Sequence, residues 1–245
     1  MSTGFDRNTH GRYLTALLTG IIKAVPEKTA FKGGTCAALF YDLPRFSFDL
    51  DFDIIRPFEI RDTDAVKEIL SANGRIVDEA DKEYALLYEF DYGKGTTKIK
   101  IEFNKRVWKN NRYKNDWFMG VPILLADEMT VATNKLVALS DRKSAVVRDL
   151  FDSWYFLSHG FMLNEELLIE RTGKGMSEYC AFLAGFIKKT FSRRNVLQGL
   201  GDALDDKQKA WAREHLIEES ILLLRKISRG SIRDVHKYIN NCRSA

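Results

Sequence analysis

The chain has 245 residues, 45% of them apolar and 29% charged, and a formal net charge of +4 at pH 7, which is typical of a globular protein with enough apolar material for a core. No apolar run reaches the ~18–20 residues of a membrane span, and the polar N-terminus lacks a secretory signal. The three scattered cysteines (Cys36, Cys180 and Cys242) fit neither a disulfide framework nor a zinc site. We therefore expect a cytoplasmic protein. So small a positive charge permits a nucleic-acid partner without requiring one.

The order of the predicted elements indicates an α+β fold. All four prolines precede residue 123, and after them the apolar spacing becomes helical. We therefore expect a mixed α/β domain with a flanked β-sheet over residues 1–125 and a helical-bundle domain over residues 126–245. The expected elements of the first domain are a helix at 10–25, a strand at 29–34, a short helix at 35–43, a strand at 46–55, a helix at 62–74, a β-hairpin of 83–92 with 96–104, and a strand at 121–126. Helices are expected in the second domain at 127–141, 145–160, 164–171, 176–191, 205–228 and 231–242.

A basic stretch, residues 105–117, interleaves Trp108, Tyr113 and Trp117 with lysines and arginines. That composition suits stacking on bases and contact with phosphates. A solvated loop with aromatic anchors explains the same residues equally simply.

The strand at 46–55 carries three acids, Asp49, Asp51 and Asp53, alternating with apolar residues. Side chains two residues apart point to the same face, ~6.5–7 Å apart along the strand. Two carboxylates at that distance repel by about 2 kcal/mol at an effective dielectric near 20. In a cleft such acids would need a hard cation such as Mg²⁺, whereas on an open strand face they would only meet water.

Two further features favour a site. The segment Gly33, Gly34, Thr35 lies between a strand and a helix, where a close backbone approach and the helix N-terminus suit a phosphate, although an ordinary tight turn has the same composition. Glu102 shares a strand face with Lys98 and Lys100, and it can complete a three-carboxylate cluster if its strand neighbours the acidic one. Such a cluster suits phosphoryl or nucleotidyl transfer, with the third acid serving as a ligand or a base.

The segment "KGGT" followed by "LPRFSFDLDF" closely resembles the first motif of the AbiEii/AbiGii-type nucleotidyltransferase toxins, a branch of the polymerase β nucleotidyltransferase superfamily. The resemblance implies that Gly33, Gly34 and Thr35 hold a triphosphate. It also implies that Asp49, Asp51 and Glu102 are the catalytic and metal-binding acids.

In the second half, "NKLVALSDRKSAVVRDLFD" resembles the helical segment of the same family. The resemblance implies that Lys135 binds nucleotide phosphate and that Arg148, Asp149 and Asp152 lie on a helix facing the active site. From the residues alone, Lys135 is an ordinary surface lysine and the other three form a surface salt-bridge ladder.

Other residues near these motifs have less definite roles. Ser47, like Arg45, can contact phosphate or hold the glycine loop, and Asp53 is a supporting acid. Arg142 and Lys143 are loop candidates for triphosphate contact.

The family implies an enzyme of two lobes with an NTP between them, dependent on Mg²⁺ or Mn²⁺. The expected reaction moves an NMP to an acceptor hydroxyl, at the acceptor end of tRNA, as the toxin of a type IV-like pair with a cognate antitoxin. A protein hydroxyl as acceptor, and a non-catalytic RNA- or partner-binding pseudoenzyme, are the alternatives. Phosphatases and glycosyltransferases that use an Asp-x-Asp fit less well, because Asp53 replaces the Thr or Val of the former and the latter lack the glycine-led helix.

Overall fold

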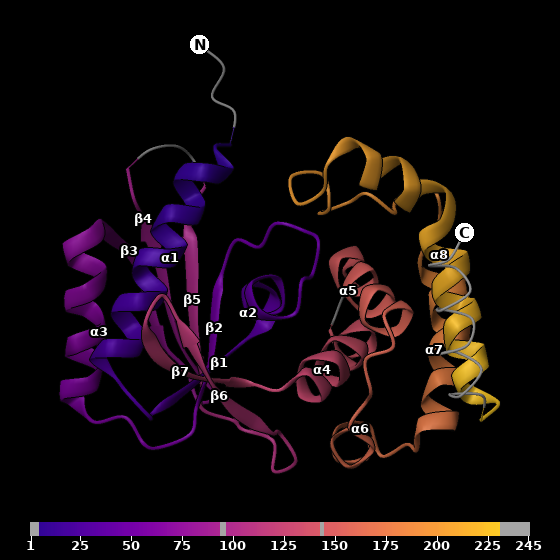
Figure 1. Ribbon diagram of the computed structural model, residues 1–245, viewed down its shortest axis with the longest axis horizontal. Coiled ribbons are helices and arrows are strands. Elements are labelled where there is room, and N and C mark those ends of the chain that lie inside the picture. Colours follow the sequence, from indigo (N-terminus) through magenta and orange to yellow (C-terminus); the bar gives the residue numbers. More distant parts are fainter. Residues whose placement is uncertain (1–4, 94–96, 143–144, 231–245) are drawn as a thin grey trace. The chain divides into compact units, whose positions relative to one another are not determined.

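The structure is a computed structural model that describes residues 5–93, 97–142 and 145–230 (Figure 1). The chain folds into two compact units. The first comprises residues 1–107 and 111–127, and the second comprises residues 108–110 and 128–245.

The first unit is built on a seven-stranded mixed sheet with the order β3-β4-β5-β2-β1-β7-β6. β2 pairs with β1 in antiparallel and with β5 in parallel orientation, so the acidic strand lies near the centre of the sheet. The strands are β1 (Thr29–Lys32), β2 (Leu50–Ile54), β3 (Arg75–Asp81), β4 (Ala85–Asp91), β5 (Ile99–Asn104), β6 (Tyr113–Phe118) and β7 (Val121–Ala126).

Three helices accompany the sheet: α1 (Arg7–Ala24), α2 (Gly33–Phe40) and α3 (Ile60–Asn73). Asp6 caps the N-terminus of α1, and its carboxylate accepts hydrogen bonds from the backbone of Asn8 and Thr9. Helices α1 and α3 run side by side (Figure 1). A Cβ on Gly20 would lie 2.5 Å from Ile69 Cγ2, so the glycine permits this close helix contact. The core combines the apolar stripe of α1 with one face of the sheet, and it includes Leu17, Leu18, Ile21, Phe31, Phe52 and Phe103.

The regular elements of the second unit, within the residues that the structure describes, are helices: α4 (Glu128–Asp141), α5 (Val147–Ser158), α6 (Glu165–Thr172), α7 (Met176–Thr190) and α8 (Asp206–Ser228). Asn164 caps α6, and Asp205 and Gln208 form a capping box at the start of α8. The Trp154 indole N–H donates to Glu219 at 2.8 Å, which ties α5 to α8.

Most of the expected elements are confirmed, including the hairpin of β4 and β5 and the end of α3 at Gly74. The acidic strand begins at Leu50, later than expected, and the edge strands β3 and β6 were not expected at all. The predicted helix at 231–242, Cys242 and Lys143 lie outside the described residues. None of the helices in the described ranges is both long and apolar enough to cross a bilayer.

Candidate functional site

The sheet places three charged side chains of the first unit in a row. In the strand register, Lys32 of β1 lies opposite Asp51 of β2, and Asp51 lies opposite Glu102 of β5. Side chains opposite one another across strands share a face, with Cβ atoms ~4.5–5.5 Å apart. The strand adjacency on which the Glu102 prediction depended is therefore present.

The start of the acidic strand is fixed to helix α2 and to β5. The hydroxyl of Thr35, which is buried, donates to the backbone carbonyl of Asp49, and the backbone N–H of Lys100 lies 3.4 Å from Asp49 Oδ1. Thr35 thus joins α2 to the start of the acidic strand, and the contact with the Lys100 backbone holds the Asp49 side chain near the beginning of β5.

The two glycines provide space for neighbouring polar groups. Gly33 has φ +81°, and a Cβ there would lie 2.1 Å from Asp51 Oδ2. A Cβ on Gly34 would lie 2.7 Å from Ser47 Oγ and 2.9 Å from Arg45 Nη2. The glycine pair therefore lets the start of α2 approach Asp51 on one side and Ser47 and Arg45 on the other.

Helix α2 begins directly at this turn, and its N-cap residue, Lys32, makes no side-chain cap. The first backbone N–H groups of a helix have no partner within the helix, and the helix dipole there favours anions. The turn can thus receive a phosphate oxygen within reach of Asp51.

Glu102 carries its own counter-charge. Lys100 Nζ lies 2.6 Å from Glu102 Oε2, and Lys100 lies two residues away on the same strand face. Burial raises the pKa of Glu102, but the hydrogen bond from Lys100 and the charges of Lys100 and Lys32 outweigh it, so the pKa lies below its usual value. Glu102 is therefore ionised at neutral pH, as a cation ligand requires.

Asp53 shares the acidic face but is committed to a buried network. Its carboxylate is 1% exposed and accepts from Lys32 Nζ at 2.5 Å, Tyr113 OH at 2.8 Å and Asn111 Nδ2 at 3.1 Å. Burial and the Asp53 charge raise the pKa of Tyr113, which keeps that hydroxyl a donor. Asp53 therefore holds Lys32 beside the glycine turn.

The oxygen donors of this face fit a divalent cation in part. Asp51 and Glu102 are two carboxylates side by side, and Mg²⁺ is commonly held by one or two carboxylates together with water and substrate phosphates. Across the ranges that the structure describes, no three His, Cys, Asp or Glu side chains come together as a complete metal-binding group. The face is thus a two-acid platform, and Asp49, the nucleotide or water would have to supply the further oxygens.

The predicted residues of the second half all lie in the second unit. Lys135 of α4 pairs with Asp152 of α5 at 2.9 Å, and Asp152 is fully buried. Arg142 Nε lies 2.9 Å from Asp149 Oδ2, while Arg148 is half-buried on α5. The two acids of α5 are therefore bound by basic residues from the preceding helix and its end, rather than by a ladder along α5 itself.

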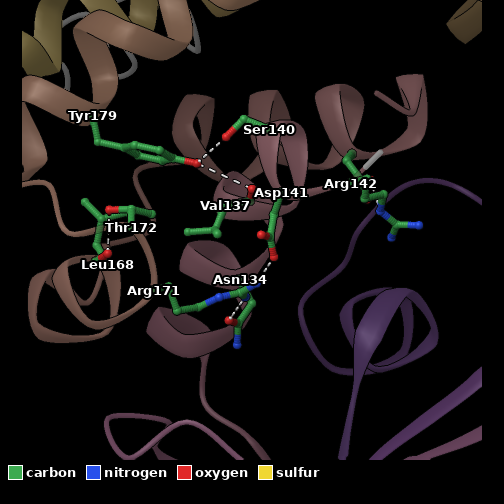
Figure 2. A network of polar contacts seen from close by, with 10 residues as sticks. Asn134, Val137, Ser140, Asp141, Arg142, Leu168, Arg171, Thr172 and Tyr179 are labelled. Carbon is green, nitrogen blue, oxygen red and sulfur yellow. Dashed lines mark hydrogen bonds and ion pairs between the residues drawn. The ribbon is translucent and has the colours of Figure 1, made fainter. Parts of the chain in front are cut away.

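A polar network fixes the helix that carries Lys135 (Figure 2). Arg171 of α6 donates to Asn134 Oδ1 at 2.5 Å and to Asp141 Oδ2 at 2.8 Å. The Tyr179 hydroxyl of α7 lies 3.0 Å from Ser140 Oγ, so α6 and α7 both hold the C-terminal half of α4. These contacts fix α4, the helix that carries Lys135, within the second unit.

The basic stretch 105–117 does not form one aromatic surface. The Trp108 ring lies under the Arg171 guanidinium at 5.3 Å, and Tyr113 is bound to Asp53, whereas Trp117 of β6 is 67% exposed. Only Trp117 of the three aromatic residues is thus available for stacking on a base. Lys32 and Lys100 were not singled out from the sequence as members of the site, although Lys32 is the first residue of the KGGT segment and Lys100 lies two positions from Glu102.

Comparison with known proteins shows which family the chain belongs to. A family model described as the nucleotidyl transferase AbiEii toxin of type IV toxin–antitoxin systems matches residues 16–216. The chain belongs to this family. The matched range includes every predicted site residue of both units, so the family confirms the resemblance recognised in the motifs.

Two solved structures share the fold of this AbiEii-family chain. JHP933 from Helicobacter pylori is 21% identical with a TM-score of 0.53, and the match covers 99% of each chain. A candidate nucleotidyltransferase from H. pylori is also 21% identical, with a TM-score of 0.54 and coverage of 95% of this chain and 97% of that one. No curated protein matches the sequence.

Proposed function

We propose that the protein is a cytoplasmic, divalent-cation-dependent nucleotidyltransferase that moves an NMP from an NTP to an acceptor hydroxyl at the acceptor end of tRNA. The chain belongs to the AbiEii toxin family. The observation that supports the proposal is that Gly33 lies against the Asp51 carboxylate and that Asp51 lies opposite Glu102 on the same sheet face. As the toxin of a type IV pair, it would be restrained by a cognate antitoxin.

Each part of the face has a role in this reaction. Asp49, Asp51 and Glu102 would hold Mg²⁺ or Mn²⁺, and the turn at Gly33, Gly34 would receive the triphosphate at the start of α2. A bound cation would neutralise charge on the phosphates and stabilise the developing charge at the reacting phosphorus. Lys135, Arg148, Asp149 and Asp152 are the nucleotide-binding candidates of the helical unit.

The chemistry is one displacement. The acceptor hydroxyl oxygen forms a bond to the α-phosphorus, the bond to the bridging oxygen breaks, and pyrophosphate leaves. The hydroxyl proton needs an acceptor, and Glu102 is the candidate because it is ionised at neutral pH. Its lowered pKa makes it a weak base, so the contribution of proton transfer should be small compared with that of charge.

The test is transfer of label from each α-³²P-labelled NTP to total RNA in the presence of Mg²⁺. Label in RNA with release of pyrophosphate supports the proposal, and label in protein instead would identify a protein acceptor. Asp51→Asn should reduce transfer by roughly 1000-fold, equivalent to about 4 kcal/mol of transition-state stabilisation. The matched control is Asp78→Asn on the exposed face of β3, and equal activity of the two variants would contradict the assignment.

A further inference from the structure

A basic groove in the first unit extends beyond the residues that the proposed chemistry uses. It has a volume of about 1110 Å³ and is bounded by α1, α2 and the segment 45–47. Ligand pockets for small molecules are usually ~300–1,000 Å³, so this groove is large for a single nucleotide. Its size favours an extended ligand.

The charge of the groove has one sign. Three arginines line it, Arg7, Arg12 and Arg45, and none of the described residues that line it carries a carboxylate. The remaining polar groups are neutral hydrogen-bonding groups, including Asn8, Thr15, Thr19 and Ser47. The groove is therefore suited to an anion with many oxygen atoms.

One helix supplies most of this polar wall in a regular stripe. Asn8, Arg12, Thr15 and Thr19 recur at helical spacing on α1, on a different face from its buried apolar residues. At 1.5 Å per residue this stripe extends over about 16 Å of helix axis, which exceeds a triphosphate and suits successive phosphates of a strand. Arg12 is exposed within it.

The groove also has apolar surface and borders residues that contact the acidic strand and the glycine turn. Leu39 and Met119 line it and are 46% and 72% exposed, and the Phe46 ring lies under the Arg7 guanidinium at 5.9 Å. Flat apolar and aromatic surfaces are the contacts that unpaired bases use. Thr35 and Ser47 line the groove and contact the acidic strand or the glycine turn, so a strand lying there would lead toward Asp51.

We propose that this groove binds the phosphodiester backbone of the acceptor RNA, with Arg12 as a central phosphate contact. The inference rests on the proposed function, because the ligand assigned to the groove is the RNA acceptor of the proposed reaction. It assigns α1, which carries none of the family's motif residues, to recognition of the acceptor.

The experiment measures equilibrium binding of labelled total tRNA without NTP, at several salt concentrations. Arg12→Gln should weaken binding several-fold and make the slope of log K against log salt less negative by about 1, the change expected for one lost phosphate contact. Arg61→Gln on α3 is the matched control, because Arg61 is 76% exposed and lies outside the groove. It should bind tRNA as the wild type does.

Binding of each NTP to the same variants separates the possibilities. The proposal requires Arg12→Gln to bind NTPs normally, so weakened NTP binding with unchanged tRNA binding would overturn it. Equal effects of Arg12→Gln and Arg61→Gln, or tRNA binding unaffected by either, would also overturn it. If the wild type transferred no nucleotide yet bound tRNA through Arg12, the groove would stand and the proposed reaction would fail.

Discussion

Lys32 and Asp53 form an ion pair in which Nζ lies 2.5 Å from Oδ1 and the Asp53 carboxylate is buried. The pair joins β1 to β2 on the face that carries Asp51. Lys32 directly precedes the two glycines. The position of the glycine turn therefore depends on Asp53, which itself takes no part in the proposed chemistry.

Asp53→Asn should therefore destabilise the protein. Removing one partner of a buried ion pair costs about 3–5 kcal/mol, and we expect the lower end because the Lys32 side chain is 23% exposed. Urea unfolding measures the free energy directly. Asp78→Asn, on the exposed face of β3, should change stability by no more than about 0.5 kcal/mol, and a comparable loss in both variants would contradict the role of the pair.

Gly33→Ala should lose both stability and nucleotide binding. A left-handed backbone costs a residue with a side chain about 1–2 kcal/mol, and the new Cβ would meet the Asp51 carboxylate. Gly185→Ala is the control, since it lies within α7 with nothing near its Cβ, and it should stabilise the protein by about 0.5–1 kcal/mol. Thermal unfolding and NTP binding, measured on both variants, test the contrast; normal NTP binding by Gly33→Ala would refute it.

Local patterns in the sequence were sufficient for most helices and for the central strands, because apolar spacing records which face of an element is buried. They failed for β3 and β6, the two edges of the sheet. Neither strand has a fully buried residue, and neither sequence, RIVDEAD or YKNDWF, shows the alternation of apolar and polar residues that marks a half-buried strand. Both strands exist because a neighbour supplies hydrogen bonds, which local sequence does not record.

The site shows the same limit. The motif order predicted Gly33, Asp51 and Glu102 as site residues, but their proximity depends on strand pairing. The antiparallel β1–β2 pair brings Gly33 to Asp51, and the parallel β2–β5 pair brings Glu102, far away in sequence, beside Asp51. The ion pair of Asp53 with Lys32 was missed because three acids in alternation look equivalent until burial distinguishes them. Nothing in the sequence indicated that Lys135 would face a buried Asp152.

The Lys100–Glu102 contact predicts how activity depends on pH. Glu102 has a lowered pKa, so it stays ionised to a lower pH than an ordinary glutamate, and activity that needs its charge is lost as the pH falls through that pKa. Lys100→Met removes the hydrogen bond and charge that lower the pKa, so the acid limb of the activity profile should move to higher pH.

Lys98→Met is the control for this shift. Lys98 directly precedes β5, and its Nζ lies 2.9 Å from Glu89 Oε2 rather than beside Glu102. Its acid limb should coincide with that of the wild type. An unchanged limb in Lys100→Met would show that Glu102 does not set the acid dependence.

Lys135→Met should destabilise the helical unit as well as reduce activity. Asp152 is fully buried, and Lys135→Met removes its cation at 2.9 Å; breaking a buried ion pair by removing one partner costs about 3–5 kcal/mol. Adding Asp152→Leu should restore stability, because an apolar pair can replace a buried ion pair without loss. Urea unfolding of both variants tests this; a double variant less stable than Lys135→Met would contradict it.

Nucleotide binding by the double variant then separates a ligand-binding role of the Lys135–Asp152 pair from a structural one. If stability returns and nucleotide binding does not, a member of the pair contacts the nucleotide, as the family resemblance implies. If both return, the role of the pair is structural.

His10 gives the fold a pH dependence of its own. The ring is fully buried, with Nδ1 3.0 Å from Tyr92 OH and Nε2 3.0 Å from the Phe48 carbonyl oxygen, and burial lowers its pKa despite the nearby Asp49 charge. Below the unfolded pKa of about 6.5 the unfolded chain takes up a proton that the folded chain resists. The free energy of unfolding should thus fall as the pH decreases below about 6.5, by at most about 1.4 kcal/mol per pH unit for one proton.

His10→Gln should remove this part of the pH dependence of the free energy of unfolding. Above pH 7 the variant should show only a loss of stability from the lost packing, and that loss should not vary with pH. Urea unfolding between pH 5 and 8, at roughly half-unit steps around the histidine range, measures both effects. His215→Gln on the exposed side of α8 should keep the slope of the wild type. A wild-type slope in His10→Gln would contradict the assignment of this pH dependence to the His10 ring, which contacts the Phe48 carbonyl oxygen.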